Sequence, residues 1–249
     1  MSTARPDRAP AADGAGLAVV AVDGPSGSGK SSVSRGVARE LGLRYLDTGA
    51  MYRAATWAVL RDGVPLDDPA AVARAASGVV IEVSDHPDES WVHVDGSDVS
   101  RAIREQAVTG AVSAVAAVAE VRALLVEQQR AAVRAAAAAG QGIVVEGRDI
   151  GSVVLPDADL KVWLVADPAV RAARRAAEDV AAGRISPAEA DAAVEAVRAD
   201  LARRDAADAG RAASPTAQAP DAVVVDASEL GLAEVIAAVV DLVRERTAA

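Results

Sequence analysis

One segment, residues 24–31 (GPSGSGKS), constrains this chain more than any other. It fits the pattern G-x-x-x-x-G-K-[ST] and lies between an apolar run, residues 17–23, and a helical pattern over residues 30–41 that Gly42 ends. Glycines let the backbone curl so that its N–H groups converge on phosphate oxygens, and the following helix directs its positive end to the same point. The segment therefore predicts a loop that holds the phosphates of a nucleotide.

The composition excludes several kinds of site. Cysteine is absent, so disulfides, thiolate metal sites and a cysteine nucleophile are excluded. The net charge of −10 argues against general binding to nucleic acid or to an anionic membrane. The apolar runs are too short to span a bilayer, and residues 1–16 lack the apolar core of a signal peptide. We expect a disordered tail over residues 1–16 and a cytoplasmic location.

The remaining pattern alternates strands with helices. Further buried strands are expected at residues 143–146, 160–166 and 222–225, and helices at 50–60, 111–139, 187–211 and 232–246. This alternation predicts an α/β fold with a mostly parallel sheet and helices on both faces. Two segments, 64–106 and 171–215, interrupt it, and the first contains a small hairpin over residues 79–83 and 91–94.

A second motif narrows the class of protein. The segment YLDTGAMYR, residues 45–53, resembles the LDSGAxYR segment of bacterial cytidylate kinases. The resemblance runs from Val19 to Glu245 in the family's order, through residues 98–104, Ser113, 121–122, EGRDIG at 146–151, 171–175, 204–211, Pro215 and 221–226.

This resemblance implies a P-loop NTPase fold with a five-stranded parallel sheet and the transfer of a phosphoryl group from ATP to CMP or dCMP, with Mg²⁺. It also implies a division of residues 17–249 into a core (17–63, 107–170 and 216–249), an NMP-binding insert (64–106) and a helical lid (171–215). A monomer is expected.

The phosphate loop supplies the donor side. In this motif Lys30 reaches the β- and γ-phosphates, and the Ser31 hydroxyl can sit on Mg²⁺. A compact ammonium can follow a moving phosphoryl group, and Lys30 is one of only two lysines among 26 basic residues. Arginines at the start of the lid segment would bind the ATP phosphates together with Lys30. Closure of the lid would exclude water from the site. The expected ATP contacts are Gly24, Pro25, Ser26, Gly27, Ser28, Gly29, Lys30, Ser31, Ser32, Arg171 and Arg175.

The acceptor side follows from the resemblance. It implies that guanidinium groups of Arg53, Arg148 and Arg211 hold the acceptor phosphate, because such forks bind phosphate oxygens in pairs. The base amino group requires an acceptor, and Asp149 stands at the family's position for it; a ligand of Mg²⁺-bound water is the alternative role. Lys30, Arg148 and Arg211 are the expected catalytic residues. The expected CMP contacts are Thr48, Arg53, Ser113, Arg122, Arg148, Asp149, Arg204, Asp208 and Arg211.

Two of these residues conflict with the expected long helix. Ser113 and Arg122 are nine residues apart, which places them on opposite faces of one continuous helix. Relatives often have a proline between them, whereas this chain has Ala119. Either the helix breaks without proline, or one of the two does not contact the base. A serine bonded to its own helix backbone is the alternative for Ser113.

Two other functions remain open. A P-loop kinase could act on another small acceptor, such as UMP or AMP. An ATP-binding regulator would need no acceptor site at all. A GTPase is excluded because it needs an Asn-Lys-x-Asp motif, and the only lysine besides Lys30, Lys161, is followed by Val-Trp.

Overall fold

A parallel sheet forms the centre of the computed structural model, which describes residues 17–181, 183, 185–211 and 214–248. Among these residues, five strands lie in the order β2-β6-β1-β7-β8, and each neighbouring pair is parallel. The bounds are β1 Val19–Asp23, β2 Arg44–Asp47, β6 Ile143–Glu146, β7 Leu160–Val165 and β8 Val223–Asp226. The expected α/β fold with a five-stranded parallel sheet is confirmed.

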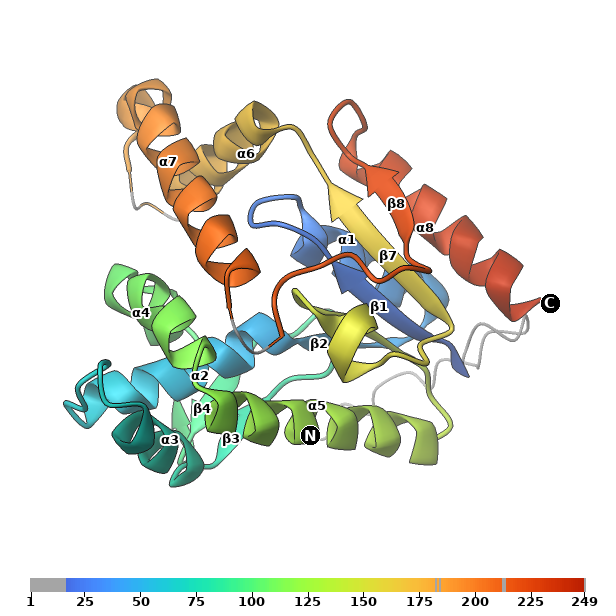
Figure 1. Cartoon of the computed structure of the whole chain (residues 1–249). Helices are drawn as coiled ribbons and strands as arrows, with labels where there is room; N and C mark the ends of the chain where they lie inside the picture. Colours follow the sequence, from blue (N-terminus) through green and yellow to red (C-terminus); the bar gives the residue numbers. More distant parts are fainter. Residues whose placement is uncertain (1–16, 182, 184, 212–213, 249) are drawn as a thin grey trace, which may run out of the picture.

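Helices cover both faces of this sheet (Figure 1). On one face lie α1 (Lys30–Leu41) and α8 (Leu232–Thr247), and on the other lie α2 (Thr48–Arg61) and α5 (Ala119–Ala138). Strand β1 contributes side chains to the cores on both faces of the sheet, because successive side chains of a strand point to opposite faces. Val20 and Val22 pack in the core with α1 and α8, whereas Ala21 packs in the core with α2 and α5.

The long helix expected over residues 111–139 is wrong. The chain forms α4 (Gln106–Ala116) and α5, which meet at an angle of 99°. Val118 between them is extended, with φ −75° and ψ 119°, and its side chain is buried in the same core as Val115 and Val121. A β-branched residue accepts an extended backbone readily, so burial of Val118 breaks the helix without proline.

The first insert contains more structure than the sequence indicated. Three strands of the described chain, β3 (Ile81–Val83), β4 (Val92–Val94) and β5 (Ser97–Asp98), form a small antiparallel sheet. The hairpin of β3 and β4 is confirmed, but β5 and helix α3 (Pro69–Ser77) were not expected. Asp68 caps α3 and Pro69 is its first residue, which is a start signal that the sequence interpretation missed.

The second insert is a pair of helices. Helix α6 (Pro168–Ala181) packs against α7 (Ala190–Ala209), which follows a short 3₁₀ turn at Pro187–Glu189. Figure 1 shows this pair beside the carboxyl end of the sheet, with α7 close to α4. The tail predicted over residues 1–16 lies outside the described residues. No described helix is by itself long and apolar enough to cross a membrane; α4 and α5 pass that test only as a bent pair.

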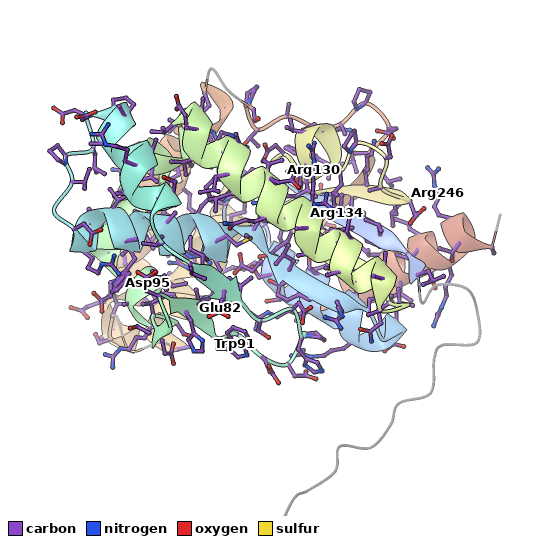
Figure 2. The ribbon with its side chains drawn as sticks, turned by 90° about the horizontal axis from the view of Figure 1, so that it is seen from below. Glu82, Trp91, Asp95, Arg130, Arg134 and Arg246 are labelled. Atoms are coloured by element: carbon purple, nitrogen blue, oxygen red, sulfur yellow. The ribbon has the colours of Figure 1, made fainter. Side chains whose placement is uncertain are left out.

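Helix α5 also anchors the turn that follows β6. The Arg130 side chain donates to the carbonyl oxygens of Val153 and Val154, at 2.9 Å each, in the π-helical turn Ile150–Val154. Figure 2 shows α5 crossing the sheet face with Arg130 and Arg134 along it. From the opposite side, Asp23 accepts the N–H groups of Ile150 and Gly151, at 2.8 and 2.7 Å. This turn begins directly after Asp149, so both contacts hold a predicted site residue in place.

Gly142 provides a test of the sheet packing. A Cβ at Gly142 would lie 2.4 Å from the Ala18 carbonyl oxygen and 2.6 Å from its nitrogen, which are rigid backbone atoms. We expect Gly142→Ala to lower the free energy of unfolding by about 2 kcal/mol, as overpacking does. The matched control is Gly110→Ala, in α4, where nothing lies within 4 Å and alanine favours the helix by up to about 1 kcal/mol. Urea unfolding measures both, and equal effects of the two variants would contradict the packing.

Candidate active site

A cavity of about 460 Å³ opens at the carboxyl ends of β1, β2 and β6. Its walls come from the phosphate loop, α2, α4, the start of α5, and α6 and α7. Most of the predicted site residues line it: Ser26, Gly27, Gly29, Lys30, Ser31, Ser32, Thr48, Arg53, Ser113, Arg122, Arg148, Asp149, Arg175, Arg204, Asp208 and Arg211. Gly24, Pro25, Ser28 and Arg171 are not among its lining residues.

The phosphate loop has a backbone that requires glycine. Gly24 has φ +149°, and a Cβ there would lie 2.1 Å from the carbonyl oxygen of Leu164 on β7. Gly29, with φ +94°, is the N-cap of α1, and no described side chain caps the first turn of that helix. The first N–H groups of an α-helix have no partner within the helix, so this helix start can bind an anion.

Lys30 is the buried cation of this loop. Its side-chain ammonium donates to the carbonyl oxygen of Pro25 at 2.6 Å. Burial, together with the nearby positive charge of Arg148, lowers the pKa of Lys30 to about 7. An anion placed beside this ammonium would stabilise its charged form, so the site favours a phosphate.

Three carboxylates end neighbouring strands of the sheet: Asp23 on β1, Asp47 on β2 and Glu146 on β6. Glu146 accepts a hydrogen bond of 2.7 Å from the Ser31 hydroxyl. Burial, followed by repulsion from Asp47, raises the pKa of Glu146 to about 7. Its second oxygen is buried and has no hydrogen-bond partner among the described residues.

The oxygens of Ser31 and Glu146 are candidate ligands for a metal ion. The described residues contain no cluster of three or more His, Cys, Asp or Glu that could hold an ion. Mg²⁺ in phosphate-transfer sites is bound by one or two protein oxygens, with waters and substrate phosphates as its other ligands. The Ser31 hydroxyl and the Glu146 carboxylate fit that requirement, since both are hard oxygen donors beside the phosphate loop.

Asp47 orients several groups on one side of the cavity. It caps α2 by accepting the Ala50 N–H at 2.8 Å, and its other oxygen accepts from Arg53 at 3.0 Å. Thr48, the next residue, donates to the carbonyl oxygen of Glu146 at 2.7 Å. The sequence interpretation missed Asp47, although it lies inside the 45–53 motif directly before a helix start.

The predicted base-contacting residues do meet in one cavity. Arg122 and Asp149, both buried, form an ion pair, and the Arg122 guanidinium lies 5.4 Å from the ring centre of Tyr52. Ser113, across the bend between α4 and α5, donates at 3.3 Å to Asp208 and not to its own helix. The bend therefore resolves the conflict between Ser113 and Arg122.

Several polar atoms around this pair have no partner among the described residues: Nε and one terminal nitrogen of Arg122, and the hydroxyl of Tyr52. Buried donors without acceptors are costly in a folded protein, so their presence indicates a ligand site. Tyr52 was not singled out from the sequence. Its position in the 45–53 motif, one residue before Arg53, was the available signal.

Asp208 connects α7 with residues from other parts of the cavity wall. Its carboxylate accepts from Arg148 Nε at 3.2 Å and lies 3.6 Å from a terminal nitrogen of Arg211. Arg204, one turn earlier on α7, donates to the carbonyl oxygen of Thr109 on α4 at 2.9 Å. Arg204 and Asp208 therefore both face the cavity from α7.

Ser26 is the residue of the phosphate loop that Arg148 and Arg171 bind. Arg148 donates to the Ser26 hydroxyl at 2.7 Å and to the Gly24 carbonyl oxygen at 3.0 Å. Arg171 donates to the Ser26 carbonyl oxygen at 2.9 Å. Arg175, one turn further along α6, lines the cavity and pairs with Glu178 at 3.1 Å.

A loop built to hold phosphates thus faces, across one cavity, a cluster of arginines suited to a second phosphate. This arrangement defines a P-loop kinase that acts on a small anionic acceptor.

Comparison with known proteins identifies the family. The family model of cytidylate kinase matches residues 20–245. The chain is 55% identical over 229 residues to the cytidylate kinase of Rhodococcus opacus (92% of this chain, 96% of the relative). It is 51% identical over 231 residues to that of Streptomyces avermitilis (93% and 94%), and 53% identical over 230 residues to that of Mycolicibacterium paratuberculosis (92% and 96%). The chain belongs to the cytidylate kinase family, which confirms the resemblance found in its sequence.

Asp23 gives the site a pH-dependent stability. Burial raises the pKa of Asp23 from its ordinary value of 3.8 to about 6, against the opposing effect of its two backbone hydrogen bonds. The folded protein therefore binds this proton more tightly than the unfolded chain does, and the free energy of unfolding falls as pH rises from about 4 to about 6. The fall due to this group is at most about 3 kcal/mol.

Urea unfolding between pH 4 and pH 7 measures this effect. Asp23→Asn removes the titrating group. We therefore expect the free energy of unfolding of the wild type to fall relative to that of the variant between about pH 4 and about pH 6, and the difference to stay constant above pH 6. Parallel curves for the two proteins would contradict the buried proton.

Proposed function

We propose that the cleft of this cytidylate kinase family member transfers the γ-phosphoryl group of ATP to CMP or dCMP. The observation that carries the proposal is the buried Arg122–Asp149 pair in the same cavity as the phosphate loop. Cytosine presents an amino donor and two acceptors on its edge. Asp149 offers an acceptor for the amino group, and the unpartnered nitrogens of Arg122 offer donors.

The donor side rests on the loop of residues 24–32. Its N–H groups and the start of α1 hold the ATP phosphates, and the Lys30 ammonium leaves the Pro25 carbonyl oxygen to follow the transferred group. The Ser31 hydroxyl and the Glu146 carboxylate that accepts its hydrogen bond would hold Mg²⁺, which when bound would neutralise negative charge on the ATP phosphates.

The acceptor phosphate is held by Arg53, Arg148 and Arg211. Each guanidinium is paired with a carboxylate, Asp47 for Arg53 and Asp208 for the other two, so these arginines are oriented before substrate arrives. Asp208 and Arg204 then serve the ribose and phosphate region. Thr48 and Ser113 complete the pocket with hydroxyl groups.

The two inserts close over the substrates. Helices α6 and α7 act as the lid, in which Arg175 reaches ATP from the cavity wall and Arg171 acts from the rim of the phosphate loop. Residues 64–106 form the NMP-binding insert. Closure excludes water, so that CMP and not water receives the phosphoryl group. The enzyme works as a monomer in the cytoplasm.

An acceptor panel tests the function. ADP formation is measured with CMP, dCMP, UMP and AMP at equal concentrations. CMP and dCMP should have the highest kcat/KM, because the carbonyl group of uracil would face the Asp149 carboxylate, acceptor against acceptor. A better rate with UMP or AMP would favour a kinase for another acceptor. ATP binding without any transfer would favour the regulator.

Asp149→Asn sharpens this panel. The asparagine amide can donate to the uracil carbonyl, so the preference for CMP over UMP in kcat/KM should fall by about tenfold or more. Glu105→Gln, a control carboxylate that does not line the cavity, should leave the preference unchanged. An unaltered preference in Asp149→Asn would assign Asp149 to another role, such as binding Mg²⁺-bound water.

Lys30→Ala tests the catalytic cation. Loss of a positioned donor to the transition state lowers kcat by about 100-fold or more. Lys161→Ala makes the same change at the only other lysine, which is also buried but pairs with Asp221 at 2.8 Å and does not line the cavity, and kcat should stay within about twofold of wild type. Circular dichroism checks that both variants are folded, and normal turnover by a folded Lys30→Ala would rule out the assigned role.

A further inference from the structure

Asp205 connects the phosphate loop with both lid helices. On α7, its Oδ1 accepts the backbone N–H of Ser26 at 2.9 Å, and its Oδ2 pairs with Arg171 of α6 at 2.6 Å. The same Arg171 nitrogen donates to the Ser26 carbonyl oxygen at 2.9 Å. Two side chains from separate helices thus bind the two polar backbone atoms of one loop residue, in a closed ring of hydrogen bonds.

The ring is shielded enough to hold a fixed geometry. The Arg171 side chain is 12% exposed and that of Asp205 is 24% exposed, so water competes with this pair less than with an open surface pair. Asp205 is one of the anionic groups that favour the charged form of Lys30, opposite the cationic Arg148. Since Arg148 takes the Ser26 hydroxyl, all three polar atoms of Ser26 are bound, each by a different side chain.

We propose that Asp205 is a positioning residue, which fixes the phosphate loop at Ser26 and holds Arg171 at the rim of that loop, so that closure of the lid and the geometry of the ATP site are set together. This inference rests on the proposed function, because it assigns α6 and α7 to the donor side. Asp205 is not among the residues that line the cavity, and its carboxylate bonds Ser26 and Arg171, so it acts through these two residues.

Two substitutions separate the two bonds. Asp205→Asn keeps an oxygen that accepts the Ser26 N–H but loses the charge that pairs with Arg171, whereas Asp205→Ala loses both. We expect kcat to fall about tenfold in Asp205→Asn and further in Asp205→Ala, as the loss of a charge-assisted hydrogen bond implies. The KM for ATP should rise in both variants, and the KM for CMP should stay within about twofold of wild type, because only the donor side is loosened.

A second measurement does not depend on activity. Arginines are frequent in α6 and α7, so trypsin cleaves this region whenever it opens. Without nucleotide, Asp205→Asn and Asp205→Ala should be cleaved between residues 171 and 211 faster than wild type. The matched control is Glu195→Gln, also on α7. The exposed Glu195 carboxylate lies 3.6 Å from Arg198 and is not part of the hydrogen-bond ring around Ser26. It should match wild type in kinetics and in cleavage.

The outcomes separate this inference from the proposed function. If wild type and Glu195→Gln do not phosphorylate CMP, the proposed function fails, whatever the Asp205 variants do. If they do, then wild-type kinetics and wild-type cleavage in Asp205→Asn and Asp205→Ala would overturn the role of Asp205. An equal rise of the KM for ATP and for CMP would also overturn it, because that result indicates a general loss of structure. Circular dichroism selects folded protein, and the isosteric Asp205→Asn keeps the test open if Asp205→Ala does not fold.

Discussion

The burial of Lys30, the first residue of α1, is the constraint on which the cleft depends. An ammonium removed from water needs negative charge close by, and Asp23 and Glu146 supply it from the ends of the neighbouring strands. These carboxylates in turn lie in a low-dielectric region, and their pKa values rise. A phosphate bound beside Lys30 would add negative charge and so favour the charged form of the ammonium.

A chain of polar contacts connects the phosphate loop with α7 and α4 across the cavity. Arg148 bonds the phosphate loop at Gly24 and Ser26 with two of its nitrogens and Asp208 of α7 with a third. Asp208 then meets Ser113 of α4. The phosphate loop, the arginines of the cavity and α7 are thus joined through single side chains. Such coupling suits an enzyme that must hold two anions in line while excluding water.

Local patterns predicted much of this fold. The apolar run before Gly24 and the helical spacing after it gave β1 and α1 correctly, because both elements depend on near neighbours. Strand β2 was missed, since Arg44-Tyr-Leu-Asp47 is short and begins and ends on charged residues. The break at Val118 was also missed, because helical spacing continues across it and only burial in the core turns the chain there.

The sequence by itself determined the phosphate loop, the parallel α/β fold and the kinase family, because these follow from local spacing and from motifs in a fixed order. Only the tertiary structure decided which side chains meet. The 99° bend brings Ser113 and Arg122 to one cavity, and α7 places Asp205 on Ser26, 179 residues away in sequence. Contacts between such distant residues depend on how whole helices pack, and no local pattern records that packing.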